Sequence, residues 1–521
     1  MRKNIFEDKL SLAEWLLTIT LLVGILMANA WHHLHVSQPQ WDDAAYLEAS
    51  FKLFYAAQEG FSSFVHQYTH LLDYTAPLIA VLPLPLYFLF GPSERSALWI
   101  NDFALIVTWF SVYQIGRKFY GKRAGLVSVL AIALIPLVYG LSRIYLIEII
   151  LMMMVVATQA VLLEENSSEG AKAIKLGVLL GLGLLTKTIF PLYMAGTFFL
   201  YRRWLFRQAP TVVGIAMTLA LTWYFSHAQR AIPHLFRASW GDAARGYSSP
   251  DIFSPKVFVG YFKLLAEEAF SYPYVVFALG SLFLAKGLQK TKWRPSFPEK
   301  FLTLWFLIPF LGCLFVINKD TRYLVPAFPA LAIALGALIS SLSYHHIGRW
   351  WCLVGGVILV GFFSTQTFGV PPGHYLKFNG PPGIEEVWDR RAVIDAIHSQ
   401  TDGQRTVIGL NFDYPAFNFN NLSSLATLLQ NPFYFLNLNS ASSLQEVVGS
   451  LHQSKSRYLL VVRGALPSNM DARLNRRREE IQNWIEQNKS YGEKVASVLL
   501  THHFGDVWGD LYRLNGNLMM K

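Results

Sequence analysis

Two adjacent carboxylates, Asp42 and Asp43, stand just beyond the first long apolar stretch of the chain. A third carboxylate, Glu48, follows on a segment whose pattern predicts a short amphipathic helix. Neighbouring like charges repel and raise each other's pKa, and ionisable groups near membrane spans are functional by default. The segment WDDAAYLEAS (41–50) is therefore a candidate catalytic or ligand-binding site, and the alternative is a solvated turn.

Cationic side chains stand at the ends of several later apolar stretches: Arg143, Lys187, Lys319 and Arg322. Taken singly, each is typical of a side chain whose stem lies in lipid while its head reaches water. Together, near an acidic pair, they indicate a charged ligand held at the membrane interface. A lipid-linked phosphate suits them, because Arg offers a bidentate fork and Lys a point charge.

The acidic pair and the cations suffice for one kind of reaction. A carboxylate can take the proton from an acceptor hydroxyl, while cations bind the phosphate. Polyprenyl phosphate is a good leaving group that needs little protonation, so a single base is enough.

Five histidines in or beside the same loop are an alternative source of chemistry: His32, His33, His35, His66 and His70. No spacing among them fixes ligands on one helix face as a HExxH motif does. We therefore expect interfacial polar residues and no cofactor, and a divalent metal has no support in the pattern.

The composition places these residues in a membrane protein. Hydrophobic residues make up 53% of the 521 residues and charged residues 15%, against about 25% charged in soluble domains. The net charge of +10 arises from Lys and Arg concentrated in short loops, as in cytoplasmic loops, and does not imply nucleic acid. The two cysteines, Cys313 and Cys352, fall in apolar runs, so no disulfide framework is predicted.

The apolar runs predict about eleven spans of the ~30 Å hydrocarbon layer. The first is 12–31, and the later runs are 96–116, 124–141, 144–163, 172–186, 189–201, 210–226, 272–288, 300–318, 323–343 and 350–368. The short run 77–90 contains Pro83 and Pro85 and is expected to dip into the membrane without crossing. The loop before it is expected to hold two interfacial helices, near 43–58 and 61–72.

Charge bias then orients the chain. With a cytoplasmic N-terminus, the basic segments 116–123, 201–208 and 286–300 are all cytoplasmic loops. One external face collects the acidic loop, residues 142–148, 185–187 and 318–326, a long loop at 227–271, and the tail from about 370. Such convergence indicates an active-site face.

The tail has a different composition from the rest. Apparent helices at 386–399, 440–455 and 469–488 alternate with strand-like runs at 405–412, 433–439 and 457–463, which predicts a small α/β domain. No Gly-rich phosphate loop follows a strand, so no nucleotide is assigned. The predicted division is a membrane module, 1–369, with an external loop 32–95, and an external α/β domain, 370–521.

Five segments resemble the GT-C glycosyltransferases, the superfamily of protein O-mannosyltransferases, aminoarabinose lipid A transferases and lipopolysaccharide-core galacturonosyl transferases. They are WDDAAYLE (41–48), YTAPLIAVLPLPLYFLFGPSERSALW (74–99), LSRIYLIE (141–148), GLGLLTKTIFPLY (181–193) and KDTRYLVPAFPAL (319–331). They follow the family's order and lie within residues 12–345. The resemblance implies a helical polytopic membrane fold.

The resemblance also implies residue roles. It makes Asp42 the general base, followed by Asp43 where the family usually has Glu. Glu148 stands where the family commonly has Asp. Arg322 and Tyr323 match the RY pair expected near the lipid phosphate, with Lys319 just before them.

One family feature is missing. The lipid A transferases carry a basic residue just before the proline of the second segment, whereas Thr75 and Ala76 precede Pro77 here. That phosphate contact is absent or replaced.

The sequence thus predicts an inverting membrane glycosyltransferase. Its partners would be a polyprenyl-phosphate sugar donor, a glycan, lipid or protein acceptor, and membrane lipids. A bacterial inner membrane is the first expectation and the endoplasmic reticulum the second. The alternatives are a flippase or transporter for a lipid-linked saccharide and an inactive scaffold. Transporters usually place ionisable residues near mid-membrane and often show inverted repeats, whereas the charges here stand at span ends.

Overall fold

A computed structural model describes residues 11–35, 38–241, 244, 251–288, 296–382, 387–464, 471–503 and 505–515. By its internal contacts the chain forms two compact units. The helical unit comprises Met1–Leu34, Val65–Leu82 and Leu98–Pro381, and the mixed unit comprises His35–Phe64, Pro83–Ala97 and Pro382–Lys521. The acidic segment 41–50 therefore groups with the C-terminal domain, while the predicted division at residue 370 stays a prediction.

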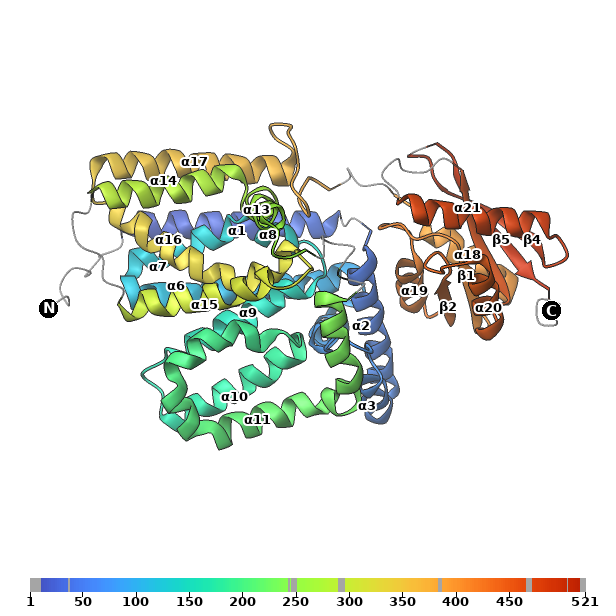
Figure 1. Ribbon diagram of the computed structural model, residues 1–521, viewed down its shortest axis with the longest axis horizontal. Coiled ribbons are helices and arrows are strands. Elements are labelled where there is room, and N and C mark those ends of the chain that lie inside the picture. The colour runs from blue at the N-terminus through green and yellow to red at the C-terminus, as the bar shows by residue number, and fades with distance from the viewer. Residues whose placement is uncertain are drawn as a thin grey trace. The chain divides into compact units, whose positions relative to one another are not determined.

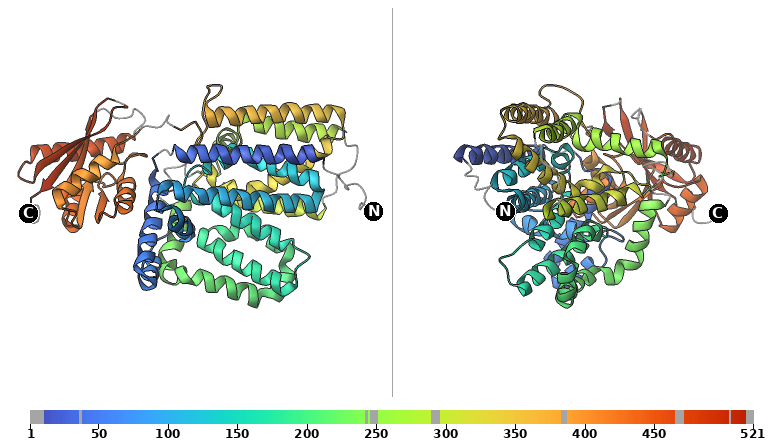
Figure 2. Two further views of the ribbon diagram at one scale, coloured as in Figure 1. Left: turned by 180° about the vertical axis from the view of Figure 1, so that it is seen from behind. Right: turned by 60° about the vertical axis from the view of Figure 1, so that its left-hand side comes forward.

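The helical unit is built from long apolar helices, several of which run side by side (Figures 1 and 2). Its elements are α1 (Leu12–Leu34), α4 (Leu78–Val81), most of α6 (Glu94–Tyr120), α7 (Lys122–Ala133), α8 (Pro136–Leu141), α9 (Ile147–Leu162), α10 (Glu169–Thr186), α11 (Phe190–Trp240), α13 (Pro255–Leu264), the π-helical η1 (Leu265–Phe270), α14 (Tyr272–Leu288), α15 (Phe297–Leu314), the 3₁₀-helical η2 (Thr321–Ala327), α16 (Phe328–Leu342) and α17 (His346–Phe368).

Six described helical segments are long and apolar enough to cross a membrane, or seven if the pair Pro255–Phe270 and Tyr272–Leu288, bent by 103°, is one span. The prediction of a helical polytopic membrane protein is confirmed. The figure of about eleven spans stays a prediction. Some expected spans fall on shorter helices, such as α9, which is buried on nearly every side and thus apolar all round.

Two expected loops are helical in the structure. The expected spans 189–201 and 210–226 both lie in α11, which is helical without a break as far as Trp240. The chain nevertheless reverses direction within α11, because Tyr224 Oη lies 3.0 Å from Thr188 Oγ1, just before the helix begins. The basic segment 201–208 is helical because Arg, Leu and Gln favour helix, and Pro210 and Pro233 are accommodated inside it. The expected long loop 227–271 is likewise mostly helical where it is described, in α11, α13 and η1. The basic segment 286–300 falls partly outside the described residues.

Small residues let α10 and α11 pack closely. A Cβ added at Gly181 would come within 2.7 Å of the Leu219 Cβ, and one at Gly177 within 2.9 Å of the Ile215 Cβ. Close approach at small residues is typical of membrane helices, which lack a hydrophobic driving force in lipid. This packing fixes the end of α10, where Lys187 stands.

The mixed unit contains α2 (Trp41–Glu59), the start of α3 (Phe61–Thr69), α5 (Leu84–Phe90) and the C-terminal domain. The predicted interfacial helices near 43–58 and 61–72 correspond to α2 and α3. The run 77–90 forms two short helices, α4 and α5, with Pro83 between them. Helix α2 packs along α19 (Phe419–Leu428), and Tyr55 Oη donates to the Leu428 carbonyl at 2.8 Å.

The C-terminal domain is a small α/β domain, as the strand and helix alternation predicted, and it has three layers. Its sheet has the order β2-β1-β3-β5-β4, with strands Phe433–Asn437, Thr406–Leu410, Tyr458–Gly464, Val507–Leu514 and Gly492–Thr501. The β2–β1 and β1–β3 pairs are parallel, and the β3–β5 and β5–β4 pairs antiparallel. Strands β4 and β5 were not predicted.

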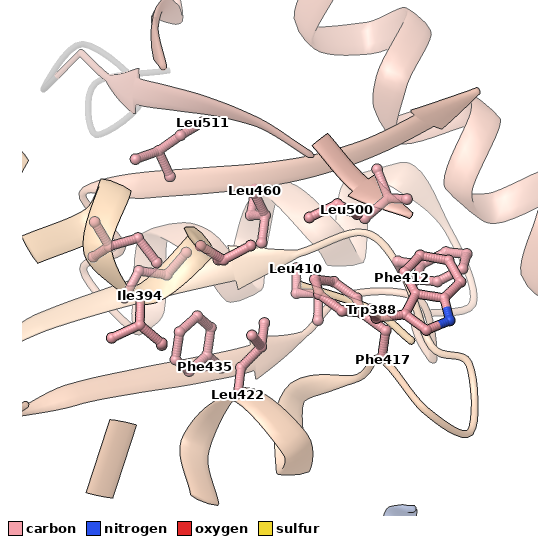
Figure 3. Packing of buried hydrophobic residues seen from close by; sticks show 14 of the residues in the cluster. Trp388, Ile394, Leu410, Phe412, Phe417, Leu422, Phe435, Leu460, Leu500 and Leu511 are labelled. Carbon is pink, nitrogen blue, oxygen red and sulfur yellow. The ribbon is translucent and has the colours of Figure 1, made fainter. Parts of the chain in front are cut away.

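Alternation along β3 divides the core of this domain between two faces. Tyr458, Leu460 and Val462 pack with residues of α18 (Arg390–Thr401) and α19, a cluster that includes Trp388 (Figure 3). Leu459 and Val461 pack on the other face with residues of α20 (Leu444–Gln453) and α21 (Ala472–Gln487). Side chains of period two thus fill both faces of a sheet covered by helices.

Candidate active site

The acidic pair lies in the first turn of α2, where negative charge is favoured by the helix dipole. Asp42 is exposed and Asp43 is buried, at 6% exposure. The Ala44 N–H donates to Asp43 Oδ1 at 2.9 Å. Burial raises the pKa of Asp43 well above its usual range. The charges of Asp42 and Glu94 raise it further, against backbone hydrogen bonds at Gln40 and Ala44.

The sequence analysis predicted that the acidic pair would hold a carboxyl of raised pKa. The structure places that property on Asp43. Two residues were missed: Glu94, in the first turn of α6, whose charge acts on Asp43, and Arg390, which donates to the Glu94 carboxylate at 3.4 Å. Glu94 lies at the start of an apolar helix, within segment 74–99, one of the five that resemble the GT-C glycosyltransferases. Its position could therefore have marked it as a candidate site residue. Arg390 lies nearly 350 residues from α2, and nothing local marked it.

Glu48 is engaged elsewhere on α2. Its carboxylate forms an ion pair with Lys52, one helical turn later. Pairs of this spacing stabilise the helix itself by a few tenths of a kcal/mol. The structure therefore shows a local partner for Glu48, and its predicted contact with substrate stays a prediction.

Three predicted residues meet in the helical unit. Glu148, in the first turn of α9, accepts a hydrogen bond from Lys187 Nζ at 3.0 Å. Lys187 Nζ also lies 4.7 Å from the centre of the Tyr323 ring, a cation–π contact. We call Glu148, Lys187, Asp320, Arg322 and Tyr323 the cation cluster, since its two cations are the candidate phosphate ligands.

Local structure explains where Lys187 stands. It is the extended residue between α10 and α11, and α11 begins with Phe190 and Pro191. A Cβ at Gly183 would come within 2.4 Å of the Phe190 ring, so only glycine lets the start of α11 pack there. Tyr323 is anchored in turn, because Tyr193 Oη donates to its carbonyl at 2.6 Å.

Arg322 is held by a neighbour that the sequence analysis did not single out. Its Nε and Nη2 donate to Asp320 Oδ2 at 2.9 and 2.8 Å. Asp320 also caps η2 by accepting from the Arg322 N–H at 3.0 Å. Burial favours the neutral form of Asp320, but the charges of Arg322 and Lys377 and the hydrogen bonds from Arg322 lower its pKa below the usual range. Asp320 is thus an ionised partner of Arg322.

Lys319 has a local structural task. Its Nζ donates to the carbonyls of Cys313, Leu314 and Val316 at 3.0, 2.7 and 2.6 Å. A cation is favoured at the C-terminal end of a helix, here α15. All three ammonium protons are engaged, so phosphate binding by Lys319 would require a rearrangement.

Arg143 lies in a separate buried network. Its Nε donates to Asn29 Oδ1 at 3.2 Å and its Nη2 to Thr367 Oγ1 at 2.8 Å. Asn29 Nδ2 donates to Asp102 Oδ1 at 3.0 Å, and His33 Nδ1 lies 3.4 Å from Asp102 Oδ2. None of the described hydrogen bonds of Arg143 reaches the cation cluster, so the structure joins Arg143 to α1, α6 and α17.

The histidines do not gather into a metal site. His33 belongs to the network of Arg143, while the rings of His66 and His70 stack on one another, 4.5 Å apart. Across the described ranges, no three His, Cys, Asp or Glu side chains are placed to share a metal ion.

The chain is similar to a known protein family and to solved structures of membrane transferases. Residues 65–227 match the family described as dolichyl-phosphate-mannose-protein mannosyltransferase. A search of curated proteins gives no match. Among solved structures, the chain is similar to ArnT from Cupriavidus metallidurans bound to undecaprenyl phosphate, with a TM-score of 0.58 and 13% identity over 98% of this chain and 100% of that one. The protein has a GT-C glycosyltransferase fold.

A second GT-C structure supports the same fold. The chain is similar to the archaeal oligosaccharyltransferase AglB from Archaeoglobus fulgidus in complex with an inhibitory peptide and a dolichol-phosphate. The TM-score is 0.52, at 13% identity, over 86% of this chain and 70% of that one. The fold that the resemblance implied is thereby confirmed, and the protein is a multi-pass membrane protein. The family match of 65–227 contains Glu148 and Lys187 but not Asp42 or Arg322.

Proposed function

We propose that the protein is an inverting glycosyltransferase that moves a sugar from a polyprenyl-phosphate-linked monosaccharide to a hydroxyl acceptor. The acceptor is a lipid, glycan or protein, and the site faces the exterior of a bacterial inner membrane. The observation that carries the proposal is the start of α2, where an exposed carboxylate, Asp42, adjoins a buried one, Asp43.

In the proposed reaction Asp42 takes the proton of the acceptor hydroxyl. The acceptor oxygen forms a bond to the anomeric carbon as the bond from that carbon to the phosphate oxygen breaks. The polyprenyl phosphate leaves with the bonding electron pair. A single displacement inverts the anomeric configuration and needs one base only.

The cation cluster supplies the second half of the proposal. Lys187 and Arg322 are already paired with Glu148 and Asp320, so both sites hold anionic oxygens. A phosphate would replace the carboxylate at Arg322, whose fork suits two phosphate oxygens. ArnT bound to undecaprenyl phosphate and AglB in complex with a dolichol-phosphate have similar folds and hold this class of lipid, which supports the choice of donor.

The placement of buried ionisable groups favours transfer over transport. His33 lies in the last turn of α1, and Glu148 in the first turn of α9. Both therefore stand toward helix ends, whereas transporters place such groups near the middle of the bilayer.

The test is transfer of a labelled sugar from a polyprenyl-phosphate donor by purified protein in nanodiscs. Asp42→Asn keeps the shape of the side chain and removes its basicity, so kcat should fall about 10²–10⁴-fold with donor binding intact. Glu59→Gln makes the same change of charge at the exposed other end of α2 and serves as the matched control. Wild-type turnover by Asp42→Asn would contradict the proposal.

A further inference from the structure

Within the mixed unit, the residues just before the acidic pair form hydrogen bonds with the C-terminal domain. Gln38 exchanges two hydrogen bonds with the backbone of Trp388: its Nε2 donates to the carbonyl at 2.5 Å, and its Oε1 accepts from the N–H at 3.0 Å. Asn421 Nδ2 donates to the Pro39 carbonyl. Trp41 Nε1 donates to Asp413 Oδ1 at 3.0 Å. Three of the four residues 38–41 are thus hydrogen-bonded to the C-terminal domain.

The three residues of the C-terminal domain that form these bonds, Trp388, Asn421 and Asp413, are themselves held by further contacts. The Trp388 ring is fully buried and packs against Phe412 and Phe417 at centroid distances of 5.4 and 5.2 Å (Figure 3). Asn421 is fully buried, and its Oδ1 accepts from the Asn418 N–H at 2.8 Å. The second oxygen of Asp413 accepts from Asn437 Nδ2 at 3.0 Å. A buried, hydrogen-bonded polar group such as Asn421 specifies one geometry.

The C-terminal domain also supplies charge to the acidic site. Arg390, the first residue of α18, is 8% exposed and pairs with Glu94, whose charge acts on Asp43. Its Nε and Nη1 have no hydrogen-bond partner in the part of the chain that is described. A buried cation held by one carboxylate is costly unless charge is needed there. Arg390 therefore offsets part of the negative charge around the start of α2.

We propose that the C-terminal domain is a positioning scaffold for the catalytic helix, in which Gln38, Trp41, Asp413 and Asn421 fix the start of α2 and so aim Asp42. This inference rests on the proposed function, because it takes Asp42 as the base. It gives the C-terminal domain a role in turnover. Displacing a catalytic group by about 1 Å can cost on the order of 10²-fold in rate. Losing one of the hydrogen bonds that hold the start of α2 is therefore expected to lower the rate.

Trp41→Phe is the first test, because it keeps an aromatic ring at this exposed position and removes the N–H that donates to Asp413. We expect kcat to fall about 10-fold, with the donor KM and the melting temperature near wild type. Asp413→Ala should have a similar effect, and the double variant should be no worse than either single one, since both remove the same contact. Tyr55→Phe removes another hydrogen bond between α2 and the C-terminal domain, thirteen residues beyond Asp42, and should change kcat less than twofold.

Hydrogen exchange gives a readout that does not depend on activity. The amides of Asp43 and Ala44 donate to the Gln40 carbonyl at 3.0 and 3.3 Å, so they report on the first turn of α2. In Gln38→Ala these two amides should exchange faster, while amides near Tyr55 stay as in wild type.

The outcomes separate the two proposals. If Asp42→Asn is inactive while Trp41→Phe and Gln38→Ala keep wild-type kcat and exchange, the scaffold inference is overturned alone. If Asp42→Asn is active, the proposed function fails, and the aiming of Asp42 fails with it whatever the exchange data show. Loss of kcat together with faster exchange at Asp43 and Ala44, but not near Tyr55, supports the scaffold.

Discussion

The cation cluster of the helical unit and the acidic start of α2 treat charge in opposite ways. In the cation cluster each carboxylate has a cation within hydrogen-bonding distance, Glu148 with Lys187 and Asp320 with Arg322. At α2 the buried Asp43 has Asp42 and Glu94 as its charged neighbours, both carboxylates. The first arrangement can exchange one anion for another, and the second favours holding a proton. A phosphate and a hydroxyl proton are the two species that the proposed reaction must handle.

The largest expected effect is on stability and comes from breaking the ion pair of Lys187 and Glu148. Lys187→Ala leaves Glu148 buried without its cation, which should destabilise the helical unit by about 3–5 kcal/mol. Thermal unfolding in detergent measures this. Lys187→Met with Glu148→Leu should recover most of the loss, since a well-packed apolar pair replaces the ions. An unchanged melting temperature in Lys187→Ala would mean that Glu148 is solvated and the two clusters do not differ.

The next effect tests whether Arg322 exchanges Asp320 for phosphate. Arg322→Lys keeps the charge and loses the fork, so the donor KM should rise about 10-fold with kcat within twofold, the scale of one charged hydrogen bond. Arg230→Lys, at an exposed arginine paired with Asp73, is the matched control. Unchanged donor kinetics in Arg322→Lys and Arg322→Ala would remove Arg322 from the site.

A smaller effect distinguishes the two acids of α2. The folded-state pKa of Asp43 is raised, so wild-type stability falls as pH rises from the unfolded-state pKa of an aspartate toward the folded value. Asp43→Asn removes that loss and should stabilise the protein by about 1 kcal/mol at alkaline pH and by less in acid. Its kcat should fall less than that of Asp42→Asn. Melting curves across pH would contradict the assignment if the difference between Asp43→Asn and wild type stayed constant.

The smallest effect concerns Glu48. Because its partner Lys52 is half-exposed and on the same helix, Glu48→Gln should change stability by less than about 0.5 kcal/mol. A change of no more than a few-fold in the acceptor KM is expected, since the carboxylate is already paired. A tenfold rise would show that Glu48 binds substrate directly.

The sequence predicted the parts of the site that carry a local signal. Asp42 and Asp43 are recognisable as an acidic pair that follows an apolar run. Lys187 and Arg322 are recognisable as cations at the ends of other apolar runs. Apolar periodicity likewise gave the helical membrane fold and three of the five strands of the C-terminal domain. Strands β4 and β5 were missed although Val507–Leu514 is rich in apolar and aromatic residues.

What escaped prediction depends on long-range contact. Nothing near Arg143 indicates that Asn29 and Thr367 will bind it in a network apart from Lys187. The pairing of Arg390 with Glu94 joins residues 296 positions apart. The charged middle of α11 is helical where the sequence predicted a loop between two spans.

The packing of α2 on α19 also sets an order of events during synthesis. About 360 residues separate the end of α2 at Glu59 from the start of α19 at Phe419. At ~5–20 residues per second, a ribosome needs on the order of 20–70 s to make that interval. Throughout it, the face of α2 that α19 covers has no native partner from the C-terminal domain. The mixed unit can therefore reach its native packing only after its C-terminal segment has been made.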